Sequence, residues 1–167
     1  MATEIAAFLP DVRKAMRTIT YGLYVLTVAV DGQVHAATVS WVTQTSFKPR
    51  MVAVGLKRET RIYEAARRVG IFCLNVVGEG QNELAATFFK FVEADSATQS
   101  IGGYSYDVSE GGIVALKDAA AWIDCKVIEE VGQQGDHALL LCEVTAGRVN
   151  PARKPLALRD TPWSYGG

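Results

Sequence analysis

The stretch YGLYVLTVAVDGQVHAATVSWVT, residues 21–43, decides the fold class of this chain. Two runs rich in valine, threonine and tyrosine flank the dipeptide Asp31-Gly32. An Asp-Gly pair between strand-like runs is a strong local signal for a type I′ hairpin turn. The stretch therefore predicts two antiparallel strands, residues 21–30 and 33–43, joined by a tight turn.

The remaining sequence adds further strands and few helices. A short amphipathic helix is expected after Pro10, and apolar periodicity with a fitting final glycine predicts a helix over 59–70. A second helix is expected over 80–90, with Leu84, Ala85, Phe88 and Phe89 on its apolar side. Buried strands are expected at 51–56 and 71–77, a meander at 102–112, and a long hairpin from 121–131 and 137–149. This order lacks the regular strand–helix alternation of a parallel sheet and favours a mainly β antiparallel barrel with flanking helices.

Length and composition restrict the class of protein. The 167 residues suit one domain, 1–167, and 49% hydrophobic with 21% charged residues indicates a globular chain. No apolar run approaches the roughly 20 residues of a membrane helix, and the first residues suit neither a secretion signal nor a transit peptide. A net charge of −1 disfavours general nucleic-acid binding. We therefore expect a cytoplasmic protein without a membrane or nucleic-acid partner.

The cysteines and histidines do not form a recognisable metal or disulfide pattern. Cys73, Cys125 and Cys142 are widely spaced, odd in number, and each lies in an apolar strand-like run. This pattern predicts buried, reduced thiols. The two histidines, His35 and His137, have no metal-ligand spacing with the cysteines. No metal site is expected.

Uncharged hydrogen-bonding side chains follow the second hairpin strand to its exit. They are Thr38, Ser40, Thr43, Gln44, Thr45 and Ser46. In a barrel, the exit of a strand lies at a mouth, where small ligands bind, and such a row suits the edge of a flat heterocycle. The alternative is that strands favour threonine and that Thr45-Ser46 shapes a turn.

A cationic segment follows this strand. Residues 48–68 contain seven Lys or Arg and two Glu, a local charge of +5. Lys57 and Arg58 end a predicted strand, and Thr60 is the expected N-cap of the next helix, with Arg61 in its first turn. Free amides, a hydroxyl and cations together form a phosphate site, although an ordinary surface unit also carries such charges. No dinucleotide fingerprint or P-loop is present, so the two segments together suggest a mononucleotide cofactor.

His137 opens the last predicted strand, directly after a turn. Its ring is therefore expected at the rim of the barrel, as a ligand-binding residue or as a structural one. In order and spacing, this segment and the earlier ones resemble the flavin reductase-like family, whose FMN-binding domain is a split β-barrel. The resembling segments are YGLYVLT, HAATVSWVTQTSFKP, FCLNVV, QNELAATFFK and GDHALLLCEV.

This resemblance covers roughly residues 11–150 and implies an antiparallel Greek-key split β-barrel that forms a homodimer. It implies FMN near the subunit interface, with Gly135-Asp136-His137 at the nicotinamide and His137 as the candidate catalytic residue. Phe88 falls with Phe89 and Lys90 where a helix end borders the flavin. The implied cofactor-binding residues are Thr38, Val39, Ser40 and Trp41 along the isoalloxazine, Thr45, Ser46, Lys57, Arg58 and Thr60 near the phosphate, and Phe89 and Lys90.

The function implied is an NAD(P)H-dependent flavin reductase, with FMN or alternatively FAD, and with NADH or NADPH as co-substrate. Hydride would pass from the nicotinamide to the flavin, and the reduced flavin or its electrons would go to a partner monooxygenase or another acceptor. Two alternatives stay open. One is an FMN-holding electron carrier of the flavoredoxin kind, which needs the same FMN cradle, and the other is a non-enzymatic flavin-binding module.

Overall fold

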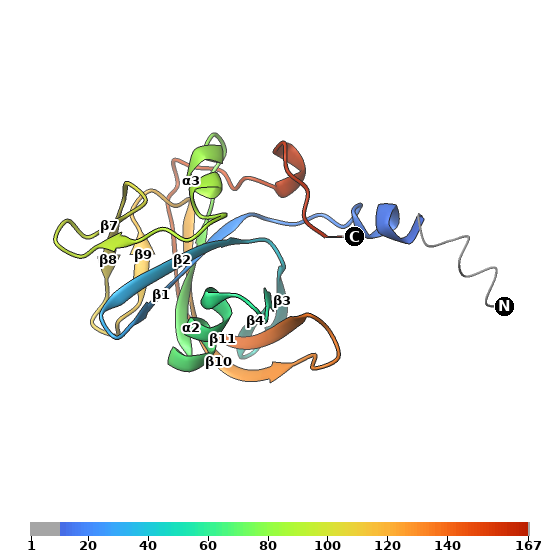
Figure 1. Cartoon of the computed structure of the whole chain (residues 1–167), viewed down its shortest axis with the longest axis horizontal. Coiled ribbons are helices and arrows are strands. Elements are labelled where there is room, and N and C mark those ends of the chain that lie inside the picture. Colours follow the sequence, from blue (N-terminus) through green and yellow to red (C-terminus); the bar gives the residue numbers. More distant parts are fainter. Residues whose placement is uncertain (1–10, 167) are drawn as a thin grey trace.

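Seven antiparallel strands form the main sheet of the computed structural model, which describes residues 11–166 (Figure 1). In spatial order they are β2 (Gln33–Val39), β1 (Tyr24–Val30), β5 (Ile71–Val76), β10 (Ala121–Val131), β11 (His137–Val149), β4 (Arg50–Lys57) and β3 (Val42–Phe47). β4 and β5 are successive in sequence, yet β10 and β11 lie between them. The mainly β, antiparallel Greek-key architecture predicted from the sequence is therefore confirmed.

The hairpin that opens the sheet forms as predicted. Asp31 and Gly32 have φ angles of 51° and 81°, and Val30 pairs with Gln33 across the turn. However, the expected continuous strand from 33 to 43 is wrong. β2 ends at Val39, and Val42 N–H donates to Ser40 C=O at 3.0 Å, so the chain bends there. β3 then pairs with β4, which makes β2 and β3 the two edges of the sheet.

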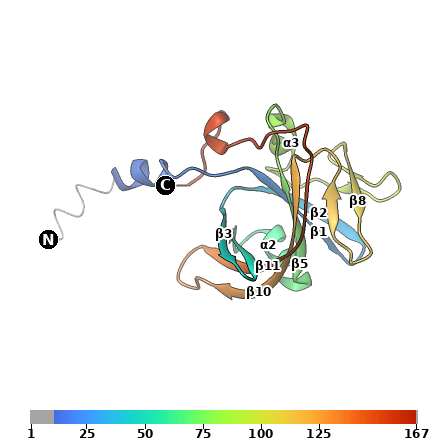
Figure 2. The same cartoon turned by 180° about the vertical axis from the view of Figure 1, so that it is seen from behind.

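Helix α2 (Arg61–Val69) has the predicted caps. Tyr63 N–H donates to the Thr60 hydroxyl at 3.3 Å, and Gly70 adopts the left-handed conformation with φ 76°. Its buried face packs against β1. Residues 11–16 also form a helix, which projects from the body next to the C-terminus (Figures 1 and 2). Pro10, the expected helix start, lies outside the described residues.

Helix α3 (Asn82–Thr87) is shorter than predicted. It ends before Phe88, so Phe88 and Phe89 follow it in different directions. Phe88 is 2% exposed and belongs to the core, whereas Phe89 is 53% exposed. The expectation that Phe89 lies on the apolar helix face is therefore wrong, because the helix does not extend that far.

A second, small sheet covers one end of the main one. It consists of β6 (Ala94–Asp95), β7 (Ser100–Ile101), β8 (Tyr104–Val108) and β9 (Val114–Leu116), where short meander strands were expected. Between the two sheets, the buried Asn75 side chain donates to Val25 C=O and accepts from Leu116 N–H, at 2.8 and 2.7 Å. This amide ties the sheets together.

Two hydrophobic clusters form the core. The first lies between the main sheet and α2, and the second joins α3, the small sheet and the C-terminal 3-10 helix η1 (Leu158–Asp160). Leu156 and Leu158 are buried in the second cluster and fix the course of the last residues. Cys73, Cys125 and Cys142 are buried and free, as predicted. Within residues 11–166, no helix has both the length and the apolar character that crossing a membrane requires.

Candidate functional site

A cavity of about 640 Å³ lies between the edge strand β2 and the start of α2. Besides Leu23 and Leu158, its lining comes from five segments, most of them far apart in the sequence. These are residues 35–40 of β2 and its exit, 55–57 of β4, 60–62 at the start of α2, 88–91 after α3, and 163–165 near the C-terminus. The fold therefore brings Thr38 and Ser40 of the predicted polar row to the cationic helix start, whereas Thr43, Gln44, Thr45 and Ser46 lie on β3 and do not line the cavity.

The outer edge of β2 presents backbone hydrogen-bonding groups to this cavity. Thr38 N–H donates away from β1, to Phe88 C=O at 3.0 Å, and the Thr38 hydroxyl donates to Ala85 C=O at 2.7 Å. Alternate residues of an antiparallel strand direct their backbone groups to the same side. The N–H and C=O of Ala36, which also lines the cavity, therefore point to the open edge. A flat ligand rich in donors and acceptors fits such an edge.

The opposite wall has the properties of an anion site. The N–H groups of Arg61 and Ile62 open α2, and both residues line the cavity. The first N–H groups of a helix lack intrahelical acceptors, and the helix dipole adds partial positive charge there. The Thr60 hydroxyl donates to Lys57 C=O at 2.6 Å, which fixes this turn. Backbone amides and the dipole thus favour a phosphate here.

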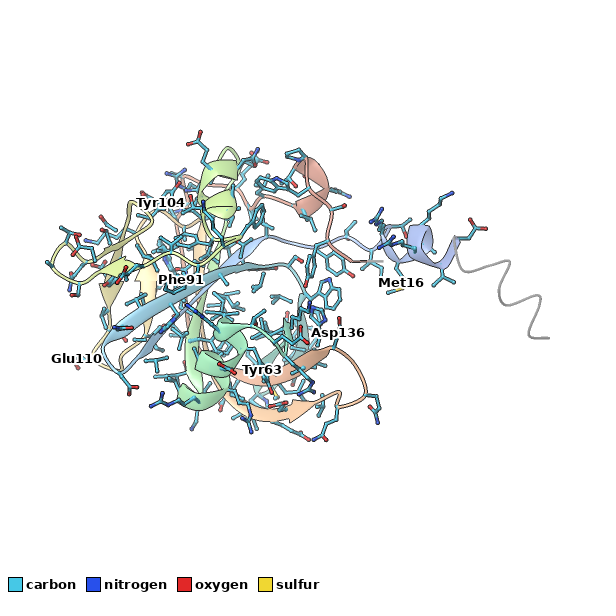
Figure 3. All side chains as sticks on the ribbon, viewed as in Figure 1. Met16, Tyr63, Phe91, Tyr104, Glu110 and Asp136 are labelled. Carbon is cyan, nitrogen blue, oxygen red and sulfur yellow. The ribbon has the colours of Figure 1, made fainter. Side chains whose placement is uncertain are left out.

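Three cations stand at this wall. Lys57, Arg61 and Lys90 all line the cavity. The Arg61 guanidinium stacks at 4.8 Å over the ring of Phe91, which is labelled in Figure 3. Lys57 Nζ lies 3.8 Å from the exposed Glu59 carboxylate, a contact of little strength in solvent. In the described part of the chain, Arg61 and Lys90 have no carboxylate partner. Positive charge therefore faces the cavity without internal neutralisation.

Arg58 lies outside the cavity lining and is bound within the fold. Its Nη1 is 2.7 Å from Glu130 Oε1, and its Nη2 donates to Gly132 C=O at 3.0 Å. The Tyr63 hydroxyl donates to the same carboxylate oxygen at 2.9 Å. The hydrogen bonds from Arg58 and then Tyr63 hold the pKa of Glu130 below its usual value. Arg58 thus has a carboxylate partner, unlike the cations at the cavity.

The predicted site residues fall into three groups in space. The structure brings seven together at the cavity: Thr38, Val39, Ser40, Lys57, Thr60, Phe89 and Lys90. Thr45 and Ser46 lie on the edge strand β3 and, like Arg58, do not line it. Trp41 and His137 belong to an aromatic cluster beside the cavity. The ligand roles of all these residues stay predictions.

The aromatic cluster is built from three chain segments. The rings of Trp41 and His137 lie 4.4 Å apart between centroids, and those of Trp41 and Tyr165 lie 5.3 Å apart. Trp41 packs directly over Gly55, where an added Cβ would be 3.1 Å from the indole Cε3. Its indole N–H is buried and, among the described residues, has no hydrogen-bond partner.

His137 is held at both ring nitrogens. Nδ1 is 2.8 Å from the Asp136 carboxylate, and Nε2 is 2.8 Å from the Tyr165 hydroxyl. The hydrogen bond with His137 holds the pKa of Asp136 below its usual value. The Asp136 side chain is exposed at the tip of the β10–β11 hairpin (Figure 3). The ring is therefore oriented at the rim, as its place after a turn indicated.

Among the cavity-lining residues that were not predicted ligands, four have side chains that matter for the site. Arg61 and Phe91 line the anion wall, and Trp163 and Tyr165 reach the cavity from the C-terminal end. The first turn of the predicted helix pointed to Arg61. For Trp163 and Tyr165, the sequence offered only a weak signal. They are two aromatic residues close to glycines after the final strand, in a segment without strand or helix periodicity.

Comparison with known proteins identifies the family. The pattern of the flavin reductase like domain matches residues 16–162. The chain is 33% identical over 147 residues to the NADH-dependent flavin reductase StyB of Pseudomonas fluorescens, covering 87% of this chain and 82% of that protein. It is 33% identical over 136 residues to the NADH-dependent FMN reductase AsuE2 of Streptomyces nodosus subsp. asukaensis, covering 80% and 71%.

The fold agrees with this relationship. The structure of the styrene monooxygenase flavin reductase SMOB from Pseudomonas putida S12 superposes with a TM-score of 0.72 at 28% identity, covering 89% of this chain and 91% of that one. Other relatives, the diflavin flavoproteins, are longer, and the chain spans about 24% of their length. The fold is a split β-barrel. The chain belongs to the flavin reductase-like domain family.

Proposed function

We propose that this protein is an NADH-dependent flavin reductase that binds FMN in the cavity between β2 and α2. The observation that carries the proposal is the pairing of two walls: an open strand edge and, across one cavity, a cationic helix start. FMN joins a flat heterocycle to a phosphate, and the two walls match these two parts in chemistry. The family membership and the names of StyB and AsuE2 support the same assignment.

The residues present fit this cofactor. The backbone edge of β2 around Thr38 would hydrogen-bond the heteroatom edge of the ring, and Phe89 would border it. Lys57 and Arg61, with the first amides of α2, would hold the phosphate, and Thr60 would fix the turn that presents them. The fit is supported by Arg61 and Lys90, which line the cavity and have no carboxylate partner in the described part of the chain, and by Lys57, whose partner is the exposed Glu59.

The bound flavin would supply the redox chemistry by accepting a hydride from a nicotinamide. The chain's own role is binding and orientation. The aliphatic and aromatic residues among the cavity lining exclude water, and Asp136 fixes the ring of His137 at the rim beside Trp41. From there His137 would orient the nicotinamide, and holding two reactants in register contributes much of such a rate. No acid–base pair is required.

Assembly and location extend the proposal. We propose a homodimer, because apolar side chains are exposed around the barrel, including Phe47 at 83% and Val149 at 74%. The name of SMOB, the reductase of a styrene monooxygenase, supports a partner oxygenase as the electron acceptor. Three buried free thiols suit the reducing cytoplasm, which we propose as the location.

Anaerobic reduction of the flavin-loaded protein tests the function. The protein is titrated with FMN and FAD by flavin fluorescence, then mixed with NADH or NADPH while the flavin absorbance is followed. We expect tight FMN binding and bleaching by NADH. His137→Ala should keep FMN affinity and lower the kcat/KM for NADH by about 5- to 150-fold, the loss of one orienting contact. A protein that binds FMN but is never bleached is a carrier, and one that binds no flavin contradicts the proposal.

A further inference from the structure

Residues near the C-terminus line one side of the cavity. We call residues 163–166 the C-terminal strap (Figures 1 and 2). The Trp163 ring meets the Phe89 ring edge-on at 4.8 Å, and Trp163 N–H donates to the Thr161 hydroxyl at 3.2 Å. At the other end, Arg17 Nε donates to Gly166 C=O at 3.3 Å. The strap is thus anchored at both ends and forms part of the cavity wall.

Tyr165 of the strap occupies the free nitrogen of His137. Because a carboxylate can only accept, the Asp136 carboxylate accepts from Nδ1–H of His137. The other ring nitrogen, Nε2, shares a hydrogen bond of 2.8 Å with the Tyr165 hydroxyl. In this arrangement neither nitrogen of His137 is available to an incoming ligand.

Two observations indicate that this contact is made to open. The Tyr165 side chain is 48% exposed, so little apolar burial opposes its departure. The strap also covers the indole of Trp41, and a Cβ on Gly166 would lie 3.7 Å from the indole nitrogen. That N–H is buried without an acceptor in the described part of the chain. A buried donor without an acceptor costs free energy, so this N–H disfavours the arrangement in which the strap covers Trp41. If the strap moved away, the Trp41 N–H could bind water or a ligand.

We propose that the C-terminal strap competes with the nicotinamide for His137. Tyr165 must leave His137 before the nicotinamide can be oriented there. This inference rests on the proposed function, which places the nicotinamide at His137. It makes Tyr165 a residue that sets the affinity for the dinucleotide and leaves the rate of hydride transfer unaffected. The affinity for the flavin would then depend on β2 and the start of α2, and the affinity for the dinucleotide on His137 and Tyr165.

The test compares the parent with Tyr165→Phe, which keeps the ring on Trp41 and removes only the hydroxyl. The FMN-loaded proteins are titrated with NAD⁺ by calorimetry, and NADH-dependent bleaching is followed by stopped flow. We expect the Kd for NAD⁺ and the half-saturating NADH concentration to fall about 2- to 10-fold, the range for one neutral hydrogen bond. The limiting bleaching rate should stay within about twofold.

Two controls separate the strap from other causes. The first control is Tyr21→Phe. The Tyr21 ring lies 6.4 Å from the Trp41 ring between centroids but does not line the cavity. Removing its hydroxyl should change neither the Kd for NAD⁺ nor the limiting bleaching rate. In the His137→Ala background, Tyr165→Phe should have no further effect, because the contact it removes is already absent. Equal thermal midpoints for parent and variants show that the fold is intact.

Each outcome decides the inference. Unchanged or weaker NAD⁺ binding by Tyr165→Phe overturns it, and so does a lower limiting rate, which would make the hydroxyl a positioning group for His137. The NAD⁺ titration does not depend on turnover. A parent that binds NAD⁺ without being bleached by NADH would therefore contradict the proposed function and still report on the strap.

Discussion

Arg58 and Arg61 lie three positions apart at the start of α2, yet their surroundings are opposite. On the paired side, Arg58 shares the Glu130 carboxylate with Tyr63 and with Arg67, whose Nε is 3.2 Å away. On the open side, Arg61 stacks on Phe91 and faces the cavity with Lys57 and Lys90. The local charge of +5 thus includes cations that are neutralised within the fold and cations that face the cavity.

The difference shows that the number of cations in a segment does not locate an anion site. What decides is whether the fold brings a carboxylate to each cation, and Glu130 comes from β10, far away in the sequence. Arg68 is likewise paired with Asp31 of the hairpin turn, at 2.9 Å. Only the cations left over after this pairing are available to a ligand. Three predictions test this division.

The largest expected effect is on the open side. Arg61→Ala should raise the Kd for FMN by about 10- to 100-fold, the loss of one charge-assisted phosphate contact, and leave the thermal midpoint unchanged. Flavin fluorescence quenching measures the affinity. Riboflavin, which has the ring without the phosphate, is the matched control and should bind both proteins alike. Equal FMN affinity of parent and variant would place the phosphate elsewhere.

On the paired side, the effect should fall on stability. Arg58→Met removes one of the three hydrogen-bonding partners of the partly buried Glu130 carboxylate and should lower the free energy of unfolding by about 1 to 2 kcal/mol. The Kd for FMN should stay within about twofold. Urea denaturation and the same fluorescence titration give the two values. A stable Arg58→Met protein with weakened FMN binding would reverse the assignment of the two sides.

The smallest expected effect is a difference between the paired and the open side in how their contributions depend on pH. Glu130 has a lowered pKa in the folded state, so its ionised form contributes stability above the ordinary value of 4.5. That contribution is lost as pH falls through the lowered pKa. The stability difference between parent and Arg58→Met should therefore be constant from about pH 5 to 8 and shrink only below about 4.5.

On the open side, the pH dependence should come from the phosphate itself. A phosphate monoester loses its second charge near pH 6, so the effect of Arg61→Ala on FMN affinity should already decrease between about pH 7 and 5. Urea denaturation from pH 3 to 8 and fluorescence titration from pH 5 to 8 measure the two curves. Coincident pH dependences would show that both arginines act on the same anion.

The fold was predictable where short signals determine it. Asp31-Gly32 sets the hairpin through two positive φ angles, and Thr60 and Gly70 cap α2 through local hydrogen bonding and backbone conformation. The division of β2 from β3 was not predictable, because no breaking residue stands at Ser40-Trp41. It depends on distant pairing, including Gly55 N–H donating to Trp41 C=O at 2.8 Å.

The candidate site divides in the same way. Thr38 and Thr60 were found because a strand exit and a helix cap have sequence signals of their own. The pairing of Arg58 with Glu130 and the contact of Tyr165 with His137 join residues 72 and 28 positions apart. Such contacts follow from the path of the chain in space, and nothing in the residues near either partner encodes them.

The close approach of Trp41 to Gly55 has a consequence for how this rim can change in evolution. A methyl group at position 55 would lie 3.1 Å from the indole Cε3 and 3.2 Å from the Cβ of Trp41, so a larger residue there must displace the ring. The two positions therefore have a preferred order of substitution. An alanine or serine at 55 requires a smaller shift of the neighbouring side chain once Trp41 has become smaller, and a tryptophan at 41 packs with the least displacement against glycine at 55.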